Sequence, residues 1–229
     1  RSTLFPYTTL FRSPAGYKNK ILGLRGRSTG LVFGLKDDSI ITKDEAKKFK
    51  FTRFTCGVDT SYSQKTEDTI AFIFTGITAC RKKITLAEQV FSNKYRDEPI
   101  TPSDIPPRLT AFLSKQRKEW GFARHVFIDS ADAGTISECK KYKRLNGSPH
   151  EFGGAWKKLP IIDRIHLEQG WLAQGDSLIL DTCTESIRER NLYSWQQDKD
   201  APEDGHDHTI NADQYSWLPF IKLIGRSDA

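Results

Sequence analysis

Short apolar runs alternate with longer segments of helical spacing along most of this chain, and their order predicts a mixed α/β sheet. The first three apolar runs follow one another with short turns, which is typical of an antiparallel meander. Further on, single apolar runs alternate with helical segments. The predicted strands are Thr55–Val58, Thr69–Phe74, Ile84–Phe91, His125–Ile128 and Ser177–Leu180.

Helix-capping residues and apolar residues three or four positions apart mark the predicted helices. Three antiparallel strands followed by alternating helices and strands are the order of the ribonuclease H-like α/β fold, so this is the predicted fold class. Residues 149–156 are predicted to be irregular or a short strand, and residues 196–205 a turn-rich loop. The predicted helices are Ile105–Trp120, Thr135–Leu145, Pro160–Gln174, one capped by Asp181 or Thr182 that runs to about Trp195, and His208–Trp217.

The beginning of the chain differs from the rest. Residues 3–13, TLFPYTTLFRS, resemble the translation of a widely used sequencing adapter, so we interpret residues 1–13 as an assembly artefact rather than as an aromatic arm. Residues 17–34 are expected to be a hairpin or connecting segment, and residues 37–50 a solvated linker or short helix. We therefore expect residues 14–50 to connect to a preceding domain and residues 51–229 to form the folded domain.

The composition narrows the functional classes only slightly. Lys and Arg number 35 against 29 Asp and Glu, and the pI of about 9.1 weakly favours a polyanionic partner. The charge excess falls by two without Arg1 and Arg12. No apolar run approaches the ~20 residues that span a bilayer. The four cysteines lack CxxC spacing, which disfavours a disulfide framework or a zinc site and fits a reducing cytoplasm.

Two carboxylates follow predicted buried strands directly. Asp59 ends the CGVD run of residues 56–59, and Asp129 ends the apolar part of VFIDSAD at 126–132. If these strands are neighbours, both carboxylates lie at one sheet edge, where two like charges need a cation between them. Two Mg²⁺ or Mn²⁺ ions about 3.5–4 Å apart would suit them and would support hydrolysis of a phosphodiester.

The last predicted helix lies within a third polar segment, GHDHTINADQY at 205–215. His208 and Asn211 are three residues apart and share a helix face, whereas Asp213 lies about 200° round from Asn211. Each element also has a simpler interpretation. Asp59 can be a turn aspartate, Asp129 can cap the following helix, and His208 can be a solvated helix start.

The ordered set of motifs resembles the nuclease domain of phage terminase large subunits, the DNA-packaging motors, over about residues 17–218. It consists of LGLRGRSTGLVFG, GVDTSY with a following EDT, FIDSADAGTISECK, LYSWQQDKD and DHTINADQY. The resemblance implies that Asp59 and Asp129 are metal ligands and that His208 belongs to a third motif. Members of this family carry an ATPase before this domain, but no GxxxxGK[ST] phosphate-binding loop occurs here.

One position departs from the family pattern. Many members have an aspartate three residues after this histidine, where this chain has Asn211, a neutral and poorer ligand for a hard cation. Either Asp213 or Asp207 takes over that role, or the second metal binds weakly, and we favour Asp213. The predicted catalytic residues are Asp59, Asp129, His208 and Asp213, and the same four with Asn211 form the predicted metal-binding set.

Basic residues suggest a path for DNA. Lys140 and Lys141 belong to a basic helix after Asp129, and Lys157 and Lys158 form a pair at a position where the family often has one. Such side chains neutralise phosphates with little regard for base sequence. The simpler interpretation of the helix is a solvated face. Trp120, Trp171 and Trp195 are predicted to belong to the core rather than to stack on bases.

We therefore expect an endonuclease that cuts double-stranded DNA during genome packaging in the cytoplasm of an infected bacterium. The resemblance adds a small terminase subunit and a portal as partners. An alternative enzyme is another ribonuclease H-like nuclease, such as a junction resolvase or transposase, against which WQQDKD and HTINADQY argue. A third possibility is an inactive DNA-binding or motor-docking module, which Asn211 keeps open.

Overall fold

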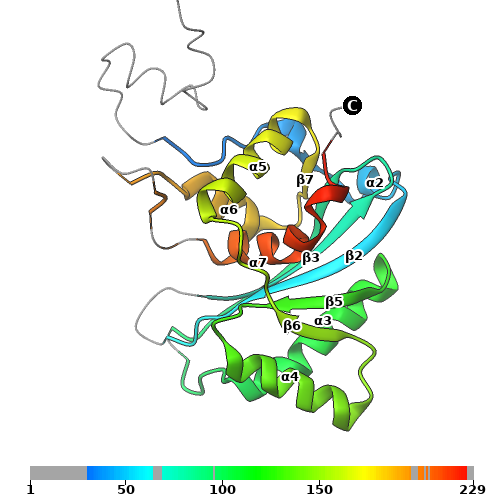
Figure 1. Ribbon diagram of the computed structural model, residues 1–229, viewed down its shortest axis with the longest axis vertical. Coiled ribbons are helices and arrows are strands. Elements are labelled where there is room, and N and C mark those ends of the chain that lie inside the picture. The colour runs from blue at the N-terminus through cyan, green and yellow to red at the C-terminus, as the bar shows by residue number, and fades with distance from the viewer. Residues whose placement is uncertain are drawn as a thin grey trace, which may run out of the picture.

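A single seven-stranded sheet organises the chain (Figure 1), in the strand order β1-β7-β4-β3-β2-β5-β6. The computed structural model describes residues 30–63, 69–94, 96–196, 201–203, 205 and 207–225, so the predictions for residues 1–29 lie outside the described residues. The strands are β1 (Ile40–Ile41), β2 (Phe51–Asp59), β3 (Thr69–Thr78), β4 (Lys83–Ser92), β5 (Ala123–Ile128), β6 (Glu151–Gly154) and β7 (Ser177–Leu180).

The predicted ribonuclease H-like mixed sheet is confirmed. Strands β2, β3 and β4 form the antiparallel meander. Strand β5 pairs parallel with β2, β6 pairs parallel with β5, and β7 pairs parallel with β4. Because β2, β4, β5, β6 and β7 all run the same way, their carboxyl ends lie at one edge of the sheet.

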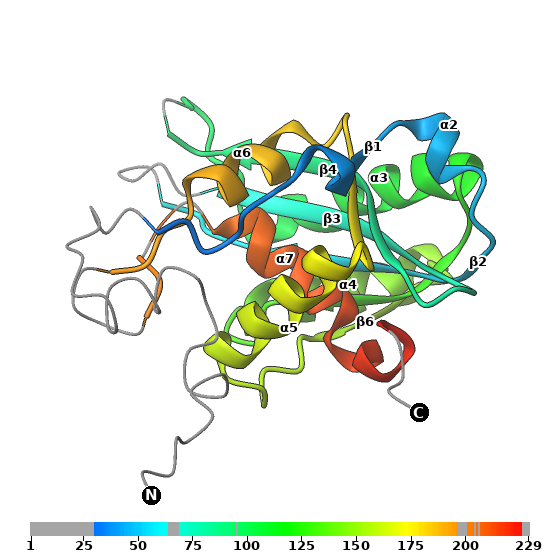
Figure 2. The ribbon, with the colours of Figure 1, turned by 90° about the horizontal axis from the view of Figure 1, so that it is seen from above.

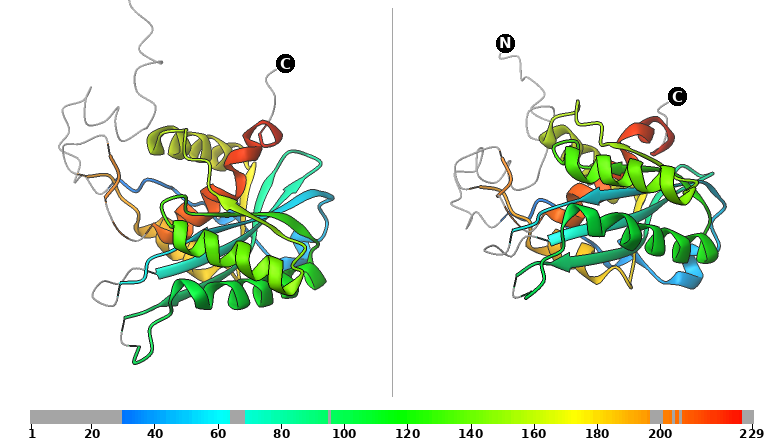
Figure 3. Two further views of the ribbon diagram at one scale, coloured as in Figure 1. Left: turned by 60° about the horizontal axis from the view of Figure 1, so that its bottom comes forward. Right: turned by 90° about the horizontal axis from the view of Figure 1, so that it is seen from below.

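Helices cover both faces of this sheet (Figures 1 and 3). Helices α3 and α4 lie on one face, while α5, α6 and α7 lie on the other. Helix α7 crosses β2 and β3 directly, and α5 lies beside it (Figure 2). The helices are α2 (Lys43–Ala46), α3 (Ile105–Glu119), α4 (Ala133–Asn146), α5 (Ile161–Gln174), α6 (Thr184–Leu192) and α7 (His208–Trp217), with 3-10 turns at Asp37–Ser39 (η2), Pro102–Asp104 (η3) and Leu218–Leu223 (η4).

The core lies on both sides of the sheet, and its middle strand, β3, is mostly apolar. Residues 70–77 of β3 are completely buried because helices cover both faces there. The predicted core positions of the tryptophans are confirmed. Trp171 is buried and packs edge-on against Trp217 at 4.9 Å, while Trp120 and Trp195 are partly buried against other apolar clusters.

Residues 14–50 were expected to be a connecting segment. The part of it that the structure describes, residues 30–50, packs against the rest of the domain. Val32 and Phe33 are buried, and β1 extends the sheet beside β7. The predicted short helix is α2, which begins with a capping box between Thr42 and Glu45. A two-residue strand has no hydrophobic period, which is why the sequence pattern did not reveal β1.

Helix α6 ends earlier than predicted. Tyr193 has extended backbone instead of helical backbone, and its carbonyl accepts a hydrogen bond from the amide of Val32 at 2.7 Å. The residues after it form bridges, Leu31 with Ser194 and Trp195 with Pro202. A pairing with a distant segment therefore ends the helix. Within the described residues no helix combines the length and apolar character that crossing a membrane requires.

Candidate active site

Asp59 and Asp129 lie side by side at the carboxyl edge of the sheet. Val58 pairs with Ile128 across the parallel β2–β5 ladder, and the amide of Asp129 donates to the carbonyl of Val58 at 2.9 Å. Each aspartate is the next residue along its own segment. The predicted adjacency of the two strand ends is therefore confirmed, and the charge of Asp129 acts on the Asp59 carboxylate.

Asp59 is a buried carboxylate whose partner comes from α7. The residue is 5% exposed, and its Oδ2 lies 2.9 Å from Nδ1 of His208. Burial raises the pKa of the Asp59 carboxyl, and the charges of Asp129 and Asp207 act in the same direction, against the hydrogen bond and charge of His208. Burial and the neighbouring acids thus both disfavour the charged form of Asp59 in the absence of a further cation.

Asp129 is held by three contacts. Its Oδ1 accepts from the amide of Ala131 at 2.8 Å and from Nζ of Lys157 at 2.6 Å. Its Oδ2 lies 3.4 Å from the hydroxyl of Tyr215. The ammonium of Lys157 thus places a positive charge beside the Asp129 carboxylate. A bound metal cation would place its charge at the same carboxylate.

Tyr215 is a site residue that the sequence analysis missed. It comes seven residues after His208, which is two turns of α7, so both side chains lie on the face of the helix toward the strand ends. Burial and the charges of Asp59 and Asp129 raise the pKa of its hydroxyl, which therefore stays protonated and donates. The ammonium of Lys157 lies 4.8 Å from the centre of its ring. The spacing from His208 was the only signal in the sequence.

A glycine sets the distance between α7 and the sheet. A methyl group at Gly57 would lie 1.7 Å from the carbonyl oxygen of Ala212, a distance no real contact has. Glycine at this position lets α7 rest directly on β2, two residues before Asp59. This close approach brings His208 within hydrogen-bonding distance of Asp59.

Asp213 does not lie with these residues, which corrects the expectation that it replaces the missing ligand. It is completely buried, its Oδ2 accepts from Lys83 and from Arg190 (2.8 Å), and its Oδ1 accepts from Thr85 at 3.0 Å. Thr75, another donor to Asp213, is four residues along β3 from the partner of Asp59, about 13 Å away at ~3.3 Å per residue.

Burial alone would raise the pKa of the Asp213 carboxyl, but Lys83 and Arg190 outweigh it and hold the pKa below its ordinary value. Both oxygens are occupied by the chain's own donors, so we remove Asp213 from the proposed ligand set. Asn211, on the other side of α7, donates from its side-chain amide to Oδ2 of Asp207 at 3.0 Å. Of the two substitutes that the sequence left open, Asp207 is thus the one whose charge acts on Asp59.

The four lysines expected to bind DNA separate into two groups. Lys157 contacts the site, and Lys158 next to it is exposed. Lys140 and Lys141 are exposed on α4, on the face of the sheet opposite α7, and Lys141 forms a surface ion pair with Glu138 at 3.7 Å. Of these four lysines, only the pair at 157–158 lies beside the strand ends.

The residues at the strand ends suit a hard divalent cation. Carboxylate oxygens of Asp59 and Asp129 are the ligands that Mg²⁺ and Mn²⁺ prefer, and His208 supplies a nitrogen beside them. Among the described residues, no three His, Cys, Asp or Glu side chains are already gathered closely enough to hold an ion. The site as described is thus closed by Lys157, Tyr215 and His208, which contact the two carboxylates.

Comparison with solved structures shows which proteins share this fold. The large terminase of a thermophilic bacteriophage, in complex with ADP, superposes with a TM-score of 0.68 at 20% identity, covering 92% of this chain and 49% of that chain. The P22 large terminase nuclease domain superposes with a TM-score of 0.60 at 11% identity, covering 85% of this chain and 95% of that one. The fold is that of a large-terminase nuclease domain.

The lengths over which the chains superpose agree with a nuclease domain rather than a full-length large terminase. The chain spans about half the length of the thermophilic-phage large terminase but matches nearly the whole of the P22 nuclease domain. No protein-family model matches the sequence, and no curated protein matches it either. At these identities the comparison establishes the terminase nuclease fold, and the chemistry has to be argued from the strand-end residues.

Proposed function

We propose that this chain is the metal-dependent endonuclease domain of a phage terminase large subunit and cleaves double-stranded DNA during genome packaging. The observation that supports this most directly is the pairing of Asp59 and Asp129 at neighbouring parallel strand ends, with His208 hydrogen-bonded to Asp59. This arrangement lies at the carboxyl edge of a sheet with the large-terminase nuclease fold, where ligands of open α/β sheets commonly bind.

Asp59 and Asp129 would hold the ions, His208 would orient Asp59 and complete the site, and Tyr215 would donate to the carboxylates. When bound, two Mg²⁺ or Mn²⁺ ions activate water and stabilise the leaving oxygen of the phosphodiester. Lys157, which now pairs with Asp129, would be available to a DNA phosphate once cations balance that carboxylate, with Lys158 beside it. Asn211 keeps Asp207 in place through its side-chain amide.

The wider assignment follows from the same proposal. Double-stranded DNA is the substrate, a small terminase subunit and a portal are the partners, and the cytoplasm of the infected bacterium is where cleavage takes place. An ATPase domain would belong to the same protein. The thermophilic-phage large terminase, solved in complex with ADP, is about twice as long as the region that this chain matches, which leaves room for such a domain.

Two observations favour a second candidate, an inactive DNA-binding or motor-docking module. The ammonium of Lys157 already neutralises Asp129, and Asn211 stands where many members of the family have an aspartate. A domain of this kind binds DNA with a strong salt dependence but does not cut it.

Plasmid cleavage separates the two. We expect residues 14–229 to nick supercoiled plasmid with Mn²⁺ or Mg²⁺ and to stop when the ions are chelated. Asp59→Asn should lower the rate at least about 100-fold because it removes the carboxylate that carries the ions. The variant should unfold at the same or a higher temperature, since a buried charge is removed.

Asp181→Asn is the matched control. Asp181 also follows a parallel strand, β7, but it is exposed and lies beyond β4 and β3 from Asp59. Its substitution should leave cleavage unchanged. Cleavage that persists in Asp59→Asn contradicts the assignment at this site, and salt-sensitive DNA binding without any cleavage in the wild type supports the inactive module.

A further inference from the structure

Arg164 is a buried arginine whose charge the described residues do not pair. It lies in the first turns of α5, it is 8% exposed, and its Nε and Nη1 atoms are buried without a hydrogen-bond partner among the described residues. Buried polar atoms nearly always have partners, and a buried charge without one is costly. An unpaired buried guanidinium in this position therefore requires an explanation.

The other buried arginine shows how this chain treats a structural guanidinium. Arg190 is completely buried, and it donates to Glu168 at 2.8 and 3.1 Å and to Asp213 at 2.8 Å. Its charge is balanced by two carboxylates inside the fold. Arg164 is nearly as buried but lacks such carboxylate contacts in the described part of the chain, so its role differs from that of Arg190.

The position of Arg164 connects it to the strand-end site. Burial lowers the pKa of its guanidinium, and among the described residues the negative charges of Asp207 and Asp129 oppose that effect, with the Tyr215 and Tyr193 hydroxyls also close enough to interact. Tyr215 and Asp129 belong to the site described above, and Asp207 acts on Asp59. Asp129 is one of the two aspartates that we propose to hold the ions, so the guanidinium lies near the strand-end site.

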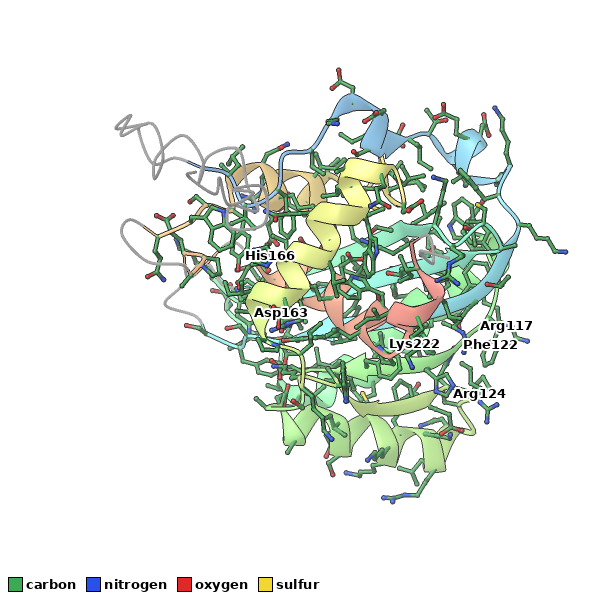
Figure 4. The ribbon with its side chains drawn as sticks, turned by 45° about the horizontal axis from the view of Figure 1, so that its top comes forward. Arg117, Phe122, Arg124, Asp163, His166 and Lys222 are labelled. Carbon is green, nitrogen blue, oxygen red and sulfur yellow. The ribbon has the colours of Figure 1, made fainter. Side chains whose placement is uncertain are left out.

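The packing of α5 on α7 fixes this position. Ile165 and Ile210 belong to one apolar cluster, and Trp171 packs against Trp217 further along the same two helices. Figure 4 shows Asp163 and His166, which flank Arg164 in sequence, on α5 beside α7, at the far end of the sheet from Arg117, Phe122 and Arg124. Arg164 therefore projects from a rigid element and not from a loop.

We propose that Arg164 binds a phosphate oxygen of the DNA backbone in the strand-end site, an inference that rests on the proposed function. Guanidinium is always charged, and its N–H groups match the oxygens of phosphate in charge and hydrogen-bonding geometry. A phosphate bound at the strand ends would supply the hydrogen-bond partner that Nε and Nη1 lack.

The test compares Arg164→Gln and Arg164→Lys with the wild type and with Arg144→Gln, a control that removes an exposed arginine from α4. Binding of a short duplex is measured by fluorescence anisotropy without divalent ions, over a range of salt concentrations. We expect Arg164→Gln to weaken binding about tenfold and to lower the slope of log K against log salt by about one. Arg164→Lys should recover part of the affinity, and Arg144→Gln should lose less than Arg164→Gln.

Thermal unfolding and phosphate give an independent readout. Arg164→Gln should unfold at the same temperature as the wild type or higher, because the variant no longer buries an unpaired charge. Inorganic phosphate should raise the unfolding temperature of the wild type above that in chloride of equal ionic strength, and should do so much less in Arg164→Gln. If phosphate raises the unfolding temperature of the wild type but the wild type and the variants bind the duplex equally well, the site binds free phosphate and the DNA proposal is overturned.

Other outcomes are equally decisive. If Arg164→Gln unfolds several degrees below the wild type, or fails to fold, Arg164 has a structural role and the proposal is overturned. The proposal is also overturned if Arg164→Gln binds DNA with the affinity and the salt slope of the wild type. Cleavage by the wild type tests the proposed function separately. A wild type that does not cleave refutes the nuclease assignment, while the binding and phosphate measurements still decide what Arg164 does.

Discussion

At the scale of single residues, two buried aspartates show how the chain distinguishes structure from function. Asp213 has both oxygens occupied by the chain's own donors, including two buried cations, and the pKa of its carboxyl is lowered. Asp59 has His208 and lies near further acids, and burial raises the pKa of its carboxyl. A saturated carboxylate stabilises the fold, whereas an under-compensated one is available to a cation.

The two aspartates should respond oppositely to the same substitution. Asp213→Asn should lower the free energy of unfolding at neutral pH by about 3–5 kcal/mol, because it leaves buried Lys83 and Arg190 with Glu168 as the one remaining described carboxylate of this cluster, and hence with one positive charge in excess. Asp59→Asn should leave stability unchanged or increase it. Chemical denaturation of both variants measures the difference.

The pH dependence of Asp213→Asn follows from the direction of the pKa shift. A carboxyl whose pKa is lowered in the folded state contributes stability above its unfolded pKa, near 3.8, and loses that contribution as the pH falls through the lower folded value. The gap between wild type and Asp213→Asn should therefore narrow in acid. An Asp213→Asn variant as stable as the wild type but unable to cleave DNA would restore Asp213 to the ligand set.

The sequence predicted the positions of Asp59 and Asp129 correctly, but not those of Asp213 and Arg164. Asp59 and Asp129 were found because each ends an apolar run, and strand ends are visible in the hydrophobic pattern. Asp213 was misplaced because helical spacing shows which residues share a face but not which face meets the sheet edge. Arg164 has no pattern that distinguishes it from a solvated helix residue, since the groups around it come from distant segments.

At the scale of elements, the contact between α7 and β2 decides the geometry of the site. Helix α7 lies on β2 because Gly57 leaves room for the carbonyl of Ala212. This contact carries His208 to Asp59 and Tyr215 to Asp129. A shift of α7 would therefore separate His208 and Tyr215 from the two aspartates, even if none of these four residues were substituted.

Gly57→Ala tests this contact. The added methyl group cannot fit against the Ala212 carbonyl, so α7 must move, and we expect a loss of at least about 1–3 kcal/mol of stability together with most of the cleavage activity. Gly153→Ala in β6 is the matched control, since a methyl group there meets no atom within 4 Å. A Gly57→Ala protein with wild-type stability and activity would show that α7 does not need this close approach.

Long periodic elements were predicted well, and short or context-dependent ones were not. The bounds of β7 and α7 agree with the prediction because each has a clear pattern and clear ends. The 193–195 stretch was predicted as helix, but its backbone pairs with residues 30–32 instead. Local propensity cannot anticipate such a long-range contact.

At the scale of the whole molecule, the strand order creates the site. Strand β5 is far from β2 in sequence but pairs with it in parallel, so Asp59 and Asp129, seventy residues apart, end on the same edge. The order of elements predicted the fold class, since few topologies accommodate a meander followed by alternating helices and strands. The inclusion of residues 30–50 in the packed domain was not visible because their apolar patches are short.

The charge distribution follows the same layers. Helices α3 and α4 cover one face, where Lys140 and Lys141 are exposed, and α5, α6 and α7 cover the other, where α7 brings His208 and Tyr215 to the strand ends. The residues proposed to contact DNA phosphates, Lys157, Lys158 and Arg164, lie on the side of α7 and the β6–α5 connection. DNA is thus expected along that side of the sheet edge.

The most direct test of the account is a crystal structure of the domain soaked in Mn²⁺ and recorded at a wavelength that gives anomalous scattering. The account predicts an anomalous peak between the carboxylates of Asp59 and Asp129, with the ammonium of Lys157 displaced from Asp129. A structure without a peak at these strand ends, with Lys157 still bound to Asp129 at saturating Mn²⁺, would contradict it.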